Sequence, residues 1–218
     1  YLNDVKAVLK TKKEAIITNS IATELKIHQF LNKYDLCPEI LDYDLLNNRT
    51  VYEYIEYPVE SSEYNEVFLE IFGKTLSKLH SLDYKNLAID TFEEKIESYR
   101  NMLCTSATIE IQESFAMFDK LYKKPYKLAF CHNDLNKMNI FLDKNMKFID
   151  WEYTGLNQPI YEIASIKKSL NFSLDQLNIF LNAYGQDFNP NEIEEFEVLV
   201  GFVEKIWQKV TNKLKSNQ

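Results

Sequence analysis

Short β-like runs alternate with one helical run over the first 57 residues. Apolar side chains at Leu25, Ile27 and Leu31 recur at helical spacing, which predicts an amphipathic helix. Polar residues at 12–14 and 47–48 favour turns between the β-like runs. The predicted elements are strands at 5–10 and 15–17 that form a hairpin, a helix at 21–33, and strands at 38–41 and 50–55.

The pattern becomes mostly helical after residue 66. Between residues 67 and 82, Phe68, Phe72 and Leu76 fall on one apolar face. Further helical patterns lie at 92–123 (one or two helices), 161–168, 175–184 and 191–215. Pro58 and the polar residues that follow mark a boundary, so we expect an α+β protein with a small β-rich lobe (1–57) and a larger helical lobe (58–218).

The segment at residues 128–150 predicts a loop followed by a tight hairpin. An apolar run ends just before a polar stretch that favours a loop around Asp134. Two short β-like runs then flank a polar turn at residues 143–145. This hairpin is expected to bring Asp150 back beside Asn139.

Asp134, Asn139 and Asp150 offer the oxygen-bearing side chains that phosphoryl transfer from a nucleotide requires. One carboxylate accepts the proton of the attacking hydroxyl, and two further groups hold Mg²⁺ against the phosphates. Mg²⁺ prefers hard oxygen ligands and keeps several waters, so one Asn and one Asp suffice from the protein. The spacing indicates Asp134 as the catalytic base and Asn139 and Asp150 as metal ligands.

Other interpretations of these residues remain open. Each of them, taken alone, is typical of a turn or a cap. A second interpretation groups His80 and His132 with Asp134 and Asp150 as a metal-hydrolase cluster, but it leaves Asn139 and the hairpin spacing unexplained. His80, at the end of a predicted helix, suits a structural role.

The pattern His132-x-Asp134-x-x-x-x-Asn139, followed by an apolar residue and Asp150, has the spacing of the kinase catalytic loop and its later metal-binding Asp. It resembles the aminoglycoside phosphotransferase and choline kinase superfamily. Residues 149–157 are most similar to the choline and ethanolamine kinases, including bacterial choline kinases of the lipopolysaccharide-modifying type. The resemblance implies a protein-kinase-like two-lobe fold, with ATP and Mg²⁺ as cofactors.

On the nucleotide side, the resemblance implies a strand lysine that pairs with the phosphates and a helix Glu that holds it. Lys10 and Glu24 are the candidates. The hairpin interpretation instead places Thr18 at the lysine position and leaves Lys10 as an exposed strand lysine. The resemblance also implies nucleotide contacts from Glu53, Ile55 and Ile149.

The N-terminal lobe departs from the family pattern because it has no glycine-rich phosphate loop. The first glycine is Gly73, and the chain opens on Tyr1 instead of Met. Either a preceding segment supplies this loop and completes the lobe, or the phosphates are covered in another way. A second departure is Glu162, where the family has Asp, which places the bracing of the catalytic loop in question.

On the substrate side, the resemblance implies contacts from Glu152 and from aromatic side chains. Aromatic faces attract a quaternary ammonium, although aromatic residues make up 14% of this chain and many rings serve only to fill the core. Trp207 lies near the chain end, where choline kinases have a Trp-rich helix. The candidates for a cation cage are Trp151, Tyr153, Tyr161, Phe202 and Trp207.

Composition narrows the partners and the compartment. A net charge of −8 argues against nucleic acid, which demands clustered Lys and Arg, and favours a cationic small molecule as partner. The three cysteines have no paired spacing, which suits a reducing compartment, so we expect the cytoplasm. No apolar run approaches the length of a membrane span.

We therefore expect an ATP-dependent kinase that phosphorylates a hydroxyl of choline or a related amino alcohol. Two alternatives remain: an aminoglycoside or sugar phosphotransferase, and a non-catalytic nucleotide or ligand binder. Aminoglycosides are polycations that favour carboxylates over rings, so the lining around Asp134 is expected to discriminate between the enzyme classes.

Overall fold

The computed structural model describes residues 6–12, 18–56, 59, 64–123 and 126–216. The second strand of the predicted hairpin, at 15–17, lies outside these residues, and so does the predicted lobe division at 57/58, which stays a prediction. In chain order, the elements are β1 (Ala7–Thr11), α1 (Ile21–Asn32), β2 (Ile40–Asp44), β3 (Arg49–Glu53), α2 (Glu66–His80), α3 (Phe92–Leu103), α4 (Ile109–Leu121), β4 (Ala129–Cys131), β5 (Ile140–Leu142), β6 (Met146–Phe148), the 3₁₀ helix η2 (Trp151–Tyr153), β7 (Gly155–Asn157), α5 (Pro159–Leu170), α6 (Leu174–Tyr184) and α7 (Pro190–Ser216).

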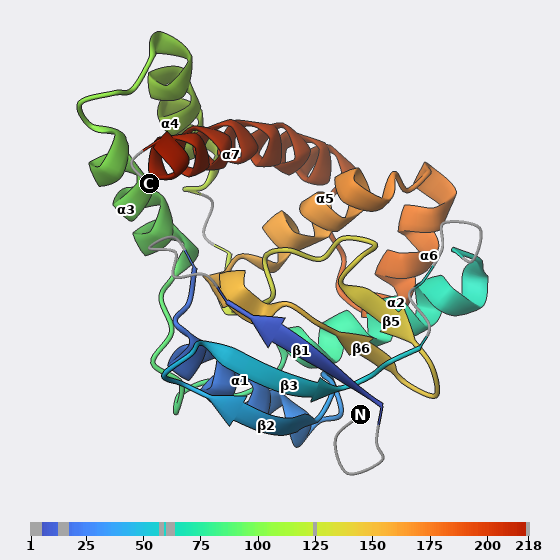
Figure 1. Cartoon of the computed structure of the whole chain (residues 1–218). Helices are drawn as coiled ribbons and strands as arrows, with labels where there is room; N and C mark the ends of the chain where they lie inside the picture. Colours follow the sequence, from blue (N-terminus) through green and yellow to red (C-terminus); the bar gives the residue numbers. More distant parts are fainter. Residues whose placement is uncertain (1–5, 13–17, 57–58, 60–63, 124–125, 217–218) are drawn as a thin grey trace.

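The N-terminal part is an antiparallel sheet with the strand order β1-β3-β2. Helix α1 lies against this sheet (Figure 1), and the ring centroids of His28 and Tyr52 are 4.9 Å apart. The helix begins at Ser20, whose hydroxyl accepts a hydrogen bond from the Thr23 amide at 3.2 Å and satisfies one of the free N–H groups of the first turn. The predictions of the 21–33 helix and of the strands β2 and β3 are confirmed.

The C-terminal part is mainly helical, as predicted. Helix α2 packs against α6, and the long helix α7 runs along α4 and α5 (Figure 1). The helical pattern at 92–123 corresponds to two helices. Helix α3 begins with a capping box, in which Thr91 and Glu94 each accept a hydrogen bond from the other's backbone amide. The chain is therefore α+β, with a small β-rich lobe and a larger helical lobe.

Gly73 allows the close packing of α2 on α6. A Cβ atom at this position would lie 2.4 Å from the Phe180 carbonyl oxygen and 2.9 Å from the Tyr184 amide nitrogen. Both neighbours are backbone atoms of α6, which cannot yield as a flexible side chain can. A side chain at residue 73 would therefore push the two helices apart.

Two small two-stranded sheets lie between the lobes. Strand β4 pairs with β7, and β5 pairs with β6. The β5–β6 pair is the tight hairpin expected from the sequence. Immediately after the hairpin, the Ile149 amide donates to the Asn139 carbonyl oxygen at 3.0 Å. This bond brings Asp150, the following residue, close to Asn139 in space.

Backbone hydrogen bonds join the two lobes. The Phe148 amide donates to the Leu36 carbonyl at 2.9 Å, and the Asn19 amide donates to the Glu152 carbonyl at 2.8 Å. Ile27 on α1 belongs to the same buried apolar cluster as the helices of the C-terminal part. Among the described residues, no helix is long and apolar enough to cross a membrane.

Candidate active site

A strained turn at Asn133 starts the candidate catalytic loop. Its φ of 66° is in the left-handed region, which is unfavourable for most residues but tolerated by Asn. The Asn133 amide donates to Glu162 Oε1 at 2.5 Å, and its side-chain oxygen accepts from Asn157 Nδ2 at 2.7 Å. The longer arm of Glu162 therefore reaches the loop, and the question raised by the Asp-to-Glu departure is settled in favour of a brace.

Asp134 faces Asn139 across the loop. Asn139 Nδ2 donates to Asp134 Oδ2 at 3.0 Å and to the Asp134 carbonyl at 2.7 Å, while Asn136 Nδ2 lies 3.3 Å from Asp134 Oδ1. Burial raises the pKa of Asp134 above its ordinary value, and the nearby charge of Asp150 adds to the rise. The carboxylate is held in one orientation by two amide groups, while one face of the residue lines a cavity.

His132 is a structural residue of the loop. Its Nε2 donates to the Ile149 carbonyl at 2.8 Å, so its Nδ1 is the nitrogen that accepts from the Asp134 amide at 3.3 Å. The ring is fully buried and lies 4.4 Å from the Trp151 ring. Both nitrogens are occupied within the loop, and the metal-hydrolase grouping of His132 and His80 with Asp134 and Asp150 does not form in the described part of the chain.

Asp150 also adopts a left-handed conformation, with φ 66° and ψ 60°. Lys10 Nζ on β1 donates to Asp150 Oδ1 at 2.6 Å. Because Asn139 uses its amide nitrogen on Asp134, its side-chain oxygen stays available as a ligand. Asn139 and Asp150 thus offer the hard oxygen atoms that suit Mg²⁺.

Lys10 forms the strand-lysine and helix-glutamate pair implied by the family resemblance. Its Nζ lies 3.3 Å from Glu24 Oε2, and its side chain is 29% exposed, so the interpretation as an exposed strand lysine is wrong. Burial works to lower the pKa of Lys10, but the carboxylates of Glu24 and Asp150 outweigh it and raise that pKa above its ordinary value. The lysine therefore keeps its charge at the wall of the site.

Lys12 is a functional candidate that the sequence analysis missed. Its Nζ pairs with Glu24 Oε1 and lies 3.4 Å from Glu152 Oε2. The Lys12 side chain is largely buried, so water hardly reaches these ion pairs. Lys10 and Lys12 are two residues apart, and side chains at this spacing along a strand point to the same face. This spacing is the feature of the sequence that could have identified Lys12. The result is a row of alternating charges from Asp150 through Lys10, Glu24 and Lys12 to Glu152.

A cavity of about 530 Å³ opens between the sheet and the β5–β6 hairpin. The predicted nucleotide contacts Lys10, Glu53, Ile55 and Ile149 line it, together with Asp150. Glu24 does not line the cavity and acts on it through Lys10. The lining residues that the sequence analysis did not name are Val8, Leu9, His28, Pro38, Tyr52, Tyr54, Glu56 and Phe141.

A second cavity, of about 430 Å³, is lined by Asp134. The predicted substrate contact Glu152 lines it, together with Tyr153, Tyr161 and Trp207, three of the five rings of the predicted cage. The prediction missed Phe92 and Tyr99 from α3, Glu204 from α7, and Lys95. Its rings are Phe92, Tyr99, Tyr153, Tyr161 and Trp207, and its carboxylates are Asp134, Glu152 and Glu204.

Two members of the predicted cage are not in this cavity. Trp151 is fully buried, and its indole nitrogen donates to the Phe148 carbonyl at 3.1 Å. Its ring packs against His132, so the prediction of Trp151 as a substrate contact is wrong. Phe202 lies on α7 but does not line the cavity. The sequence predicted that Phe202 and Trp207 lie on one helix, but not which face of that helix lines the cavity.

Trp207 and Tyr153 form the mouth of the second cavity. Trp207 Nε1 donates to the Tyr153 hydroxyl at 3.2 Å, and the two rings meet edge to face with centroids 6.4 Å apart. Burial raises the pKa of Tyr153 to about 12, so its hydroxyl stays protonated. Trp207 is 37% exposed, which leaves part of its ring free to contact a ligand.

Lys95 anchors the floor of the second cavity. Its Nζ donates to the carbonyl oxygens of Tyr153 and Thr154, at 2.8 Å each. Burial lowers the pKa of Lys95 to about 8. The next residue, Gly155, has no room for a side chain, because a Cβ atom there would lie 2.7 Å from the Asp90 carbonyl oxygen. This segment is thus fixed from two sides.

The sequence matches the family described as "Phosphotransferase enzyme family" over residues 2–196. A LicA homolog from Metamycoplasma hominis is 27% identical over 192 residues, which cover 81% of this chain and 72% of that protein. Protein LicA of Haemophilus influenzae is 28% identical over 132 residues, or 56% of this chain and 49% of that protein.

Solved structures share the fold at lower identity. The choline kinase LicA from Streptococcus pneumoniae superposes with a TM-score of 0.80 at 19% identity, covering 97% of this chain and 80% of that one. An aminoglycoside-3'-phosphotransferase of type VIII gives a TM-score of 0.69 at 15% identity, covering 90% and 84%. These likenesses confirm the predicted protein-kinase-like fold.

Proposed function

Because this chain belongs to the phosphotransferase enzyme family, we propose that it transfers the γ-phosphoryl group of ATP to a hydroxyl of choline or a related amino alcohol. The observation that carries the proposal is the position of Asp134. It lines the aromatic second cavity, and its partner Asn139 bonds through its carbonyl to the Ile149 amide, next to Asp150, which lines the first cavity. One cavity is assigned to ATP and the other to the acceptor.

The lining of the acceptor cavity favours a compact cation over a polycation. Five rings and three carboxylates line it, but Glu152 is paired with Lys12 and Glu204 with Lys168. Aromatic faces therefore provide most of the attraction, and a cation against such a face gains about 0.5–2 kcal/mol. This supports choline or ethanolamine over an aminoglycoside. The names of the relatives support the same choice, since one solved structure is of a choline kinase and one curated relative is human ethanolamine kinase 1.

In this proposal the residues have separate roles. Asp134 orients the acceptor hydroxyl and takes its proton late in a loose transition state, where position matters more than basicity. Asn139 and Asp150 hold Mg²⁺, which when bound offsets the negative charge of the phosphates. Lys10 holds a positive charge at the wall of the nucleotide cavity, and Glu24 keeps it there.

A screen of ATP consumption tests the proposal. The purified chain is assayed with choline, ethanolamine, an aminoglycoside, thiamine and a simple sugar, with Asp134→Asn as the blank. Turnover is expected to be highest with choline or ethanolamine. Turnover on an uncharged sugar alone would overturn the cation assignment. If Mg²⁺–ATP binds but no acceptor is phosphorylated, the alternative of a non-catalytic binder is supported instead.

A further inference from the structure

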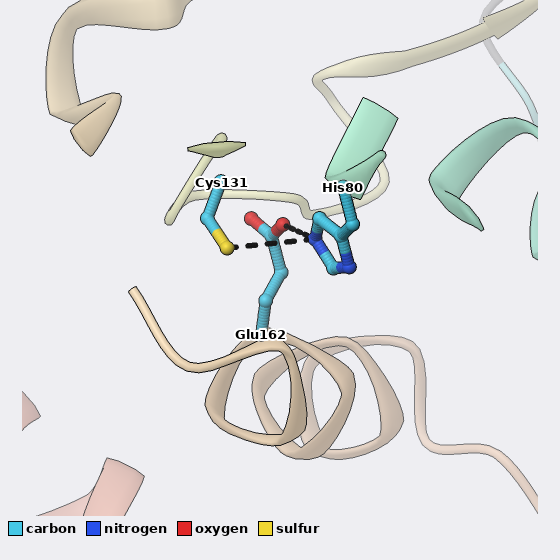
Figure 2. A group of neighbouring side chains, drawn as sticks. All are labelled: His80, Cys131 and Glu162. Carbon is cyan, nitrogen blue, oxygen red and sulfur yellow. Dashed lines mark hydrogen bonds and ion pairs between the residues drawn. The ribbon is translucent and has the colours of Figure 1, made fainter. Parts of the chain in front are cut away.

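Three side chains from distant parts of the sequence meet behind the catalytic loop. Figure 2 shows the Glu162 carboxylate of α5 between Cys131 of β4 and His80, at the end of α2. His80 Nε2 lies 2.7 Å from Glu162 Oε2 and 3.5 Å from Cys131 Sγ. One donor atom from each of the three residues lies within 4.8 Å of the other two. The roles proposed for phosphoryl transfer and for substrate binding do not explain why a thiol is part of this group.

Each of the three donors is oriented by a further partner. His80 Nδ1 lies 2.8 Å from the Tyr184 hydroxyl, Glu162 Oε1 accepts from the Asn133 amide, and Cys131 Sγ lies 3.7 Å from the Asn157 carbonyl oxygen. Hydrogen bonds at atoms that do not touch the ion, as at His80 Nδ1 and Glu162 Oε1, typically fix the ligands of protein metal sites. The contact of Cys131 is at Sγ itself and is given up when the thiolate binds. The side chains are therefore held with their donor atoms directed at one another.

We propose that His80, Cys131 and Glu162 form a binding site for Zn²⁺, separate from the magnesium site of the phosphotransferase reaction. Thiolate, imidazole and carboxylate are the zinc ligands of proteins, whereas Mg²⁺ disfavours sulfur. Bond lengths of about 2.0–2.3 Å place tetrahedral zinc ligands about 3.3–3.7 Å apart. The distance from His80 to Cys131 already has this value, and the contact from His80 to Glu162 must open by about half an ångström.

The proton balance of zinc binding is simple. His80 Nε2 now donates to the Glu162 carboxylate, so its proton moves to Nδ1 when Nε2 becomes a ligand, and Tyr184 then accepts from Nδ1. Cys131 binds as the thiolate, and its proton leaves to solvent. Four groups face the thiol from the surrounding elements: His80, Glu162, Tyr184 and Tyr122.

A cavity of about 320 Å³ reaches the site at His80, while Cys131 and Glu162 are buried behind it. His80, Ala129 and Tyr184 are among its lining residues, and it shares no lining residue with the nucleotide or acceptor cavity. A water molecule from this side can complete a tetrahedral ligand set of three side chains.

The site also has a mechanical connection to catalysis. Glu162 binds His80 through one oxygen and the Asn133 amide through the other, and Asn133 directly precedes Asp134. Movement of the Glu162 carboxylate onto the ion would shift the strained turn that positions Asp134. We expect bound zinc to lower the turnover number, and this expectation rests on the proposed function. The proposal that zinc binds here does not depend on that function.

Cobalt substitution tests the binding directly. Co²⁺ is added to the metal-free chain in a Cys104→Ser background, which removes the exposed cysteine. One equivalent is expected to produce the strong ultraviolet absorption of a cobalt–thiolate bond, and a matched Cys131→Ser variant is expected to lose it. The absence of that absorption, or its persistence without Cys131, overturns the proposal. Circular dichroism shows whether the Cys131→Ser variant is folded.

A second measurement needs no variant at the site. X-ray absorption of the zinc-loaded Cys104→Ser chain is expected to show one sulfur and three nitrogen or oxygen neighbours at zinc. A zinc coordination shell without sulfur would contradict the proposal, and this result does not depend on whether the Cys131→Ser variant folds. Zinc is then titrated into the kinase assay at saturating Mg²⁺. A several-fold fall in turnover that chelation reverses supports the connection to Asp134, whereas zinc binding with unchanged turnover refutes the connection but keeps the site.

Discussion

The nucleotide cavity and the acceptor cavity meet at the catalytic loop but are built from different interactions. On the nucleotide side, Lys10 and Asp150 line the cavity and form an ion pair, and Glu24 holds Lys10 from behind. Rings from α3, η2, α5 and α7 form most of the acceptor side. Each charge on the nucleotide side is held by specific ion pairs, whereas several rings on the acceptor side can share one ligand. Loss of one residue should therefore affect the nucleotide side sharply and the acceptor side gradually.

The largest effect is expected where both cavities meet. Asp134→Asn keeps the shape of the side chain but cannot accept the hydroxyl proton, so turnover should fall by about 10²–10⁴-fold. The affinity for Mg²⁺–ATP should change little, because Asn139 and Asp150 are untouched. Steady-state kinetics and calorimetric titration with a non-hydrolysable ATP analogue measure the two quantities. An equal loss of nucleotide affinity would show that Asp134 belongs to the nucleotide side.

The second effect tests the sharp response of the nucleotide side. Lys10→Met removes a charge-assisted contact, typically about 1.5–3 kcal/mol, so kcat/KM for ATP should fall by about 10–100-fold. Lys12→Met is the comparison variant, since Lys12 does not line the nucleotide cavity and bridges Glu24 to Glu152 in the acceptor cavity. It should raise the acceptor KM more than the ATP KM. The reverse outcome for the two lysines would exchange their roles.

The third effect concerns the floor of the acceptor cavity. Lys95→Met leaves the buried carbonyls of Tyr153 and Thr154 without their donor, which should cost about 1–3 kcal/mol in the free energy of unfolding. The acceptor KM should rise as well, because Tyr153 loses its anchor. Denaturant unfolding and acceptor titration measure these changes. Retention of both parameters would show that the lysine only fills space.

The same lysine gives the stability a pH dependence. Burial lowers its pKa to about 8, so between about pH 8 and 10.4 the unfolded chain binds more protons at this residue than the folded chain. The contribution of Lys95 to the free energy of unfolding should therefore rise with pH across this window and be lost as the pH falls through 8. Unfolding curves at several pH values should show a steeper rise for the wild type than for Lys95→Met.

The smallest effect tests the gradual response of the aromatic side. Trp207→Leu removes one ring of five, so the acceptor KM should rise by about 2–30-fold, the equivalent of one cation–π contact, with little change in turnover. Phe202→Leu, on the same helix but outside the cavity, is the control and should leave the acceptor KM unchanged. A loss of more than a hundredfold for Trp207→Leu would mean that this side also depends on a single contact.

Local pattern was sufficient for most of the fold. Helical spacing predicted α1, α2, α5, α6 and α7 to within a few residues, and the β5–β6 hairpin followed from two short apolar runs around a polar turn. The same pattern could not divide residues 92–123, because Thr108, which precedes α4, makes no side-chain capping hydrogen bond, and α3 and α4 are each positioned by packing on α7. The local pattern also did not predict which strands pair in the N-terminal sheet.

The candidate site divides along the same line. Asp134, Asn139 and Asp150 could be identified from the sequence because their spacing lies within one short loop and hairpin, where local geometry brings them together. The sequence alone therefore predicted kinase-like chemistry, which the family match supports, and the positions of the candidate oxygen ligands. Tertiary packing decided that Lys10 has two carboxylate partners, that Trp151 is buried while Trp207 reaches a cavity, and that Lys12 and Lys95 support the site. Contacts between segments more than 50 residues apart depend on how helices and sheet pack, which no local spacing contains.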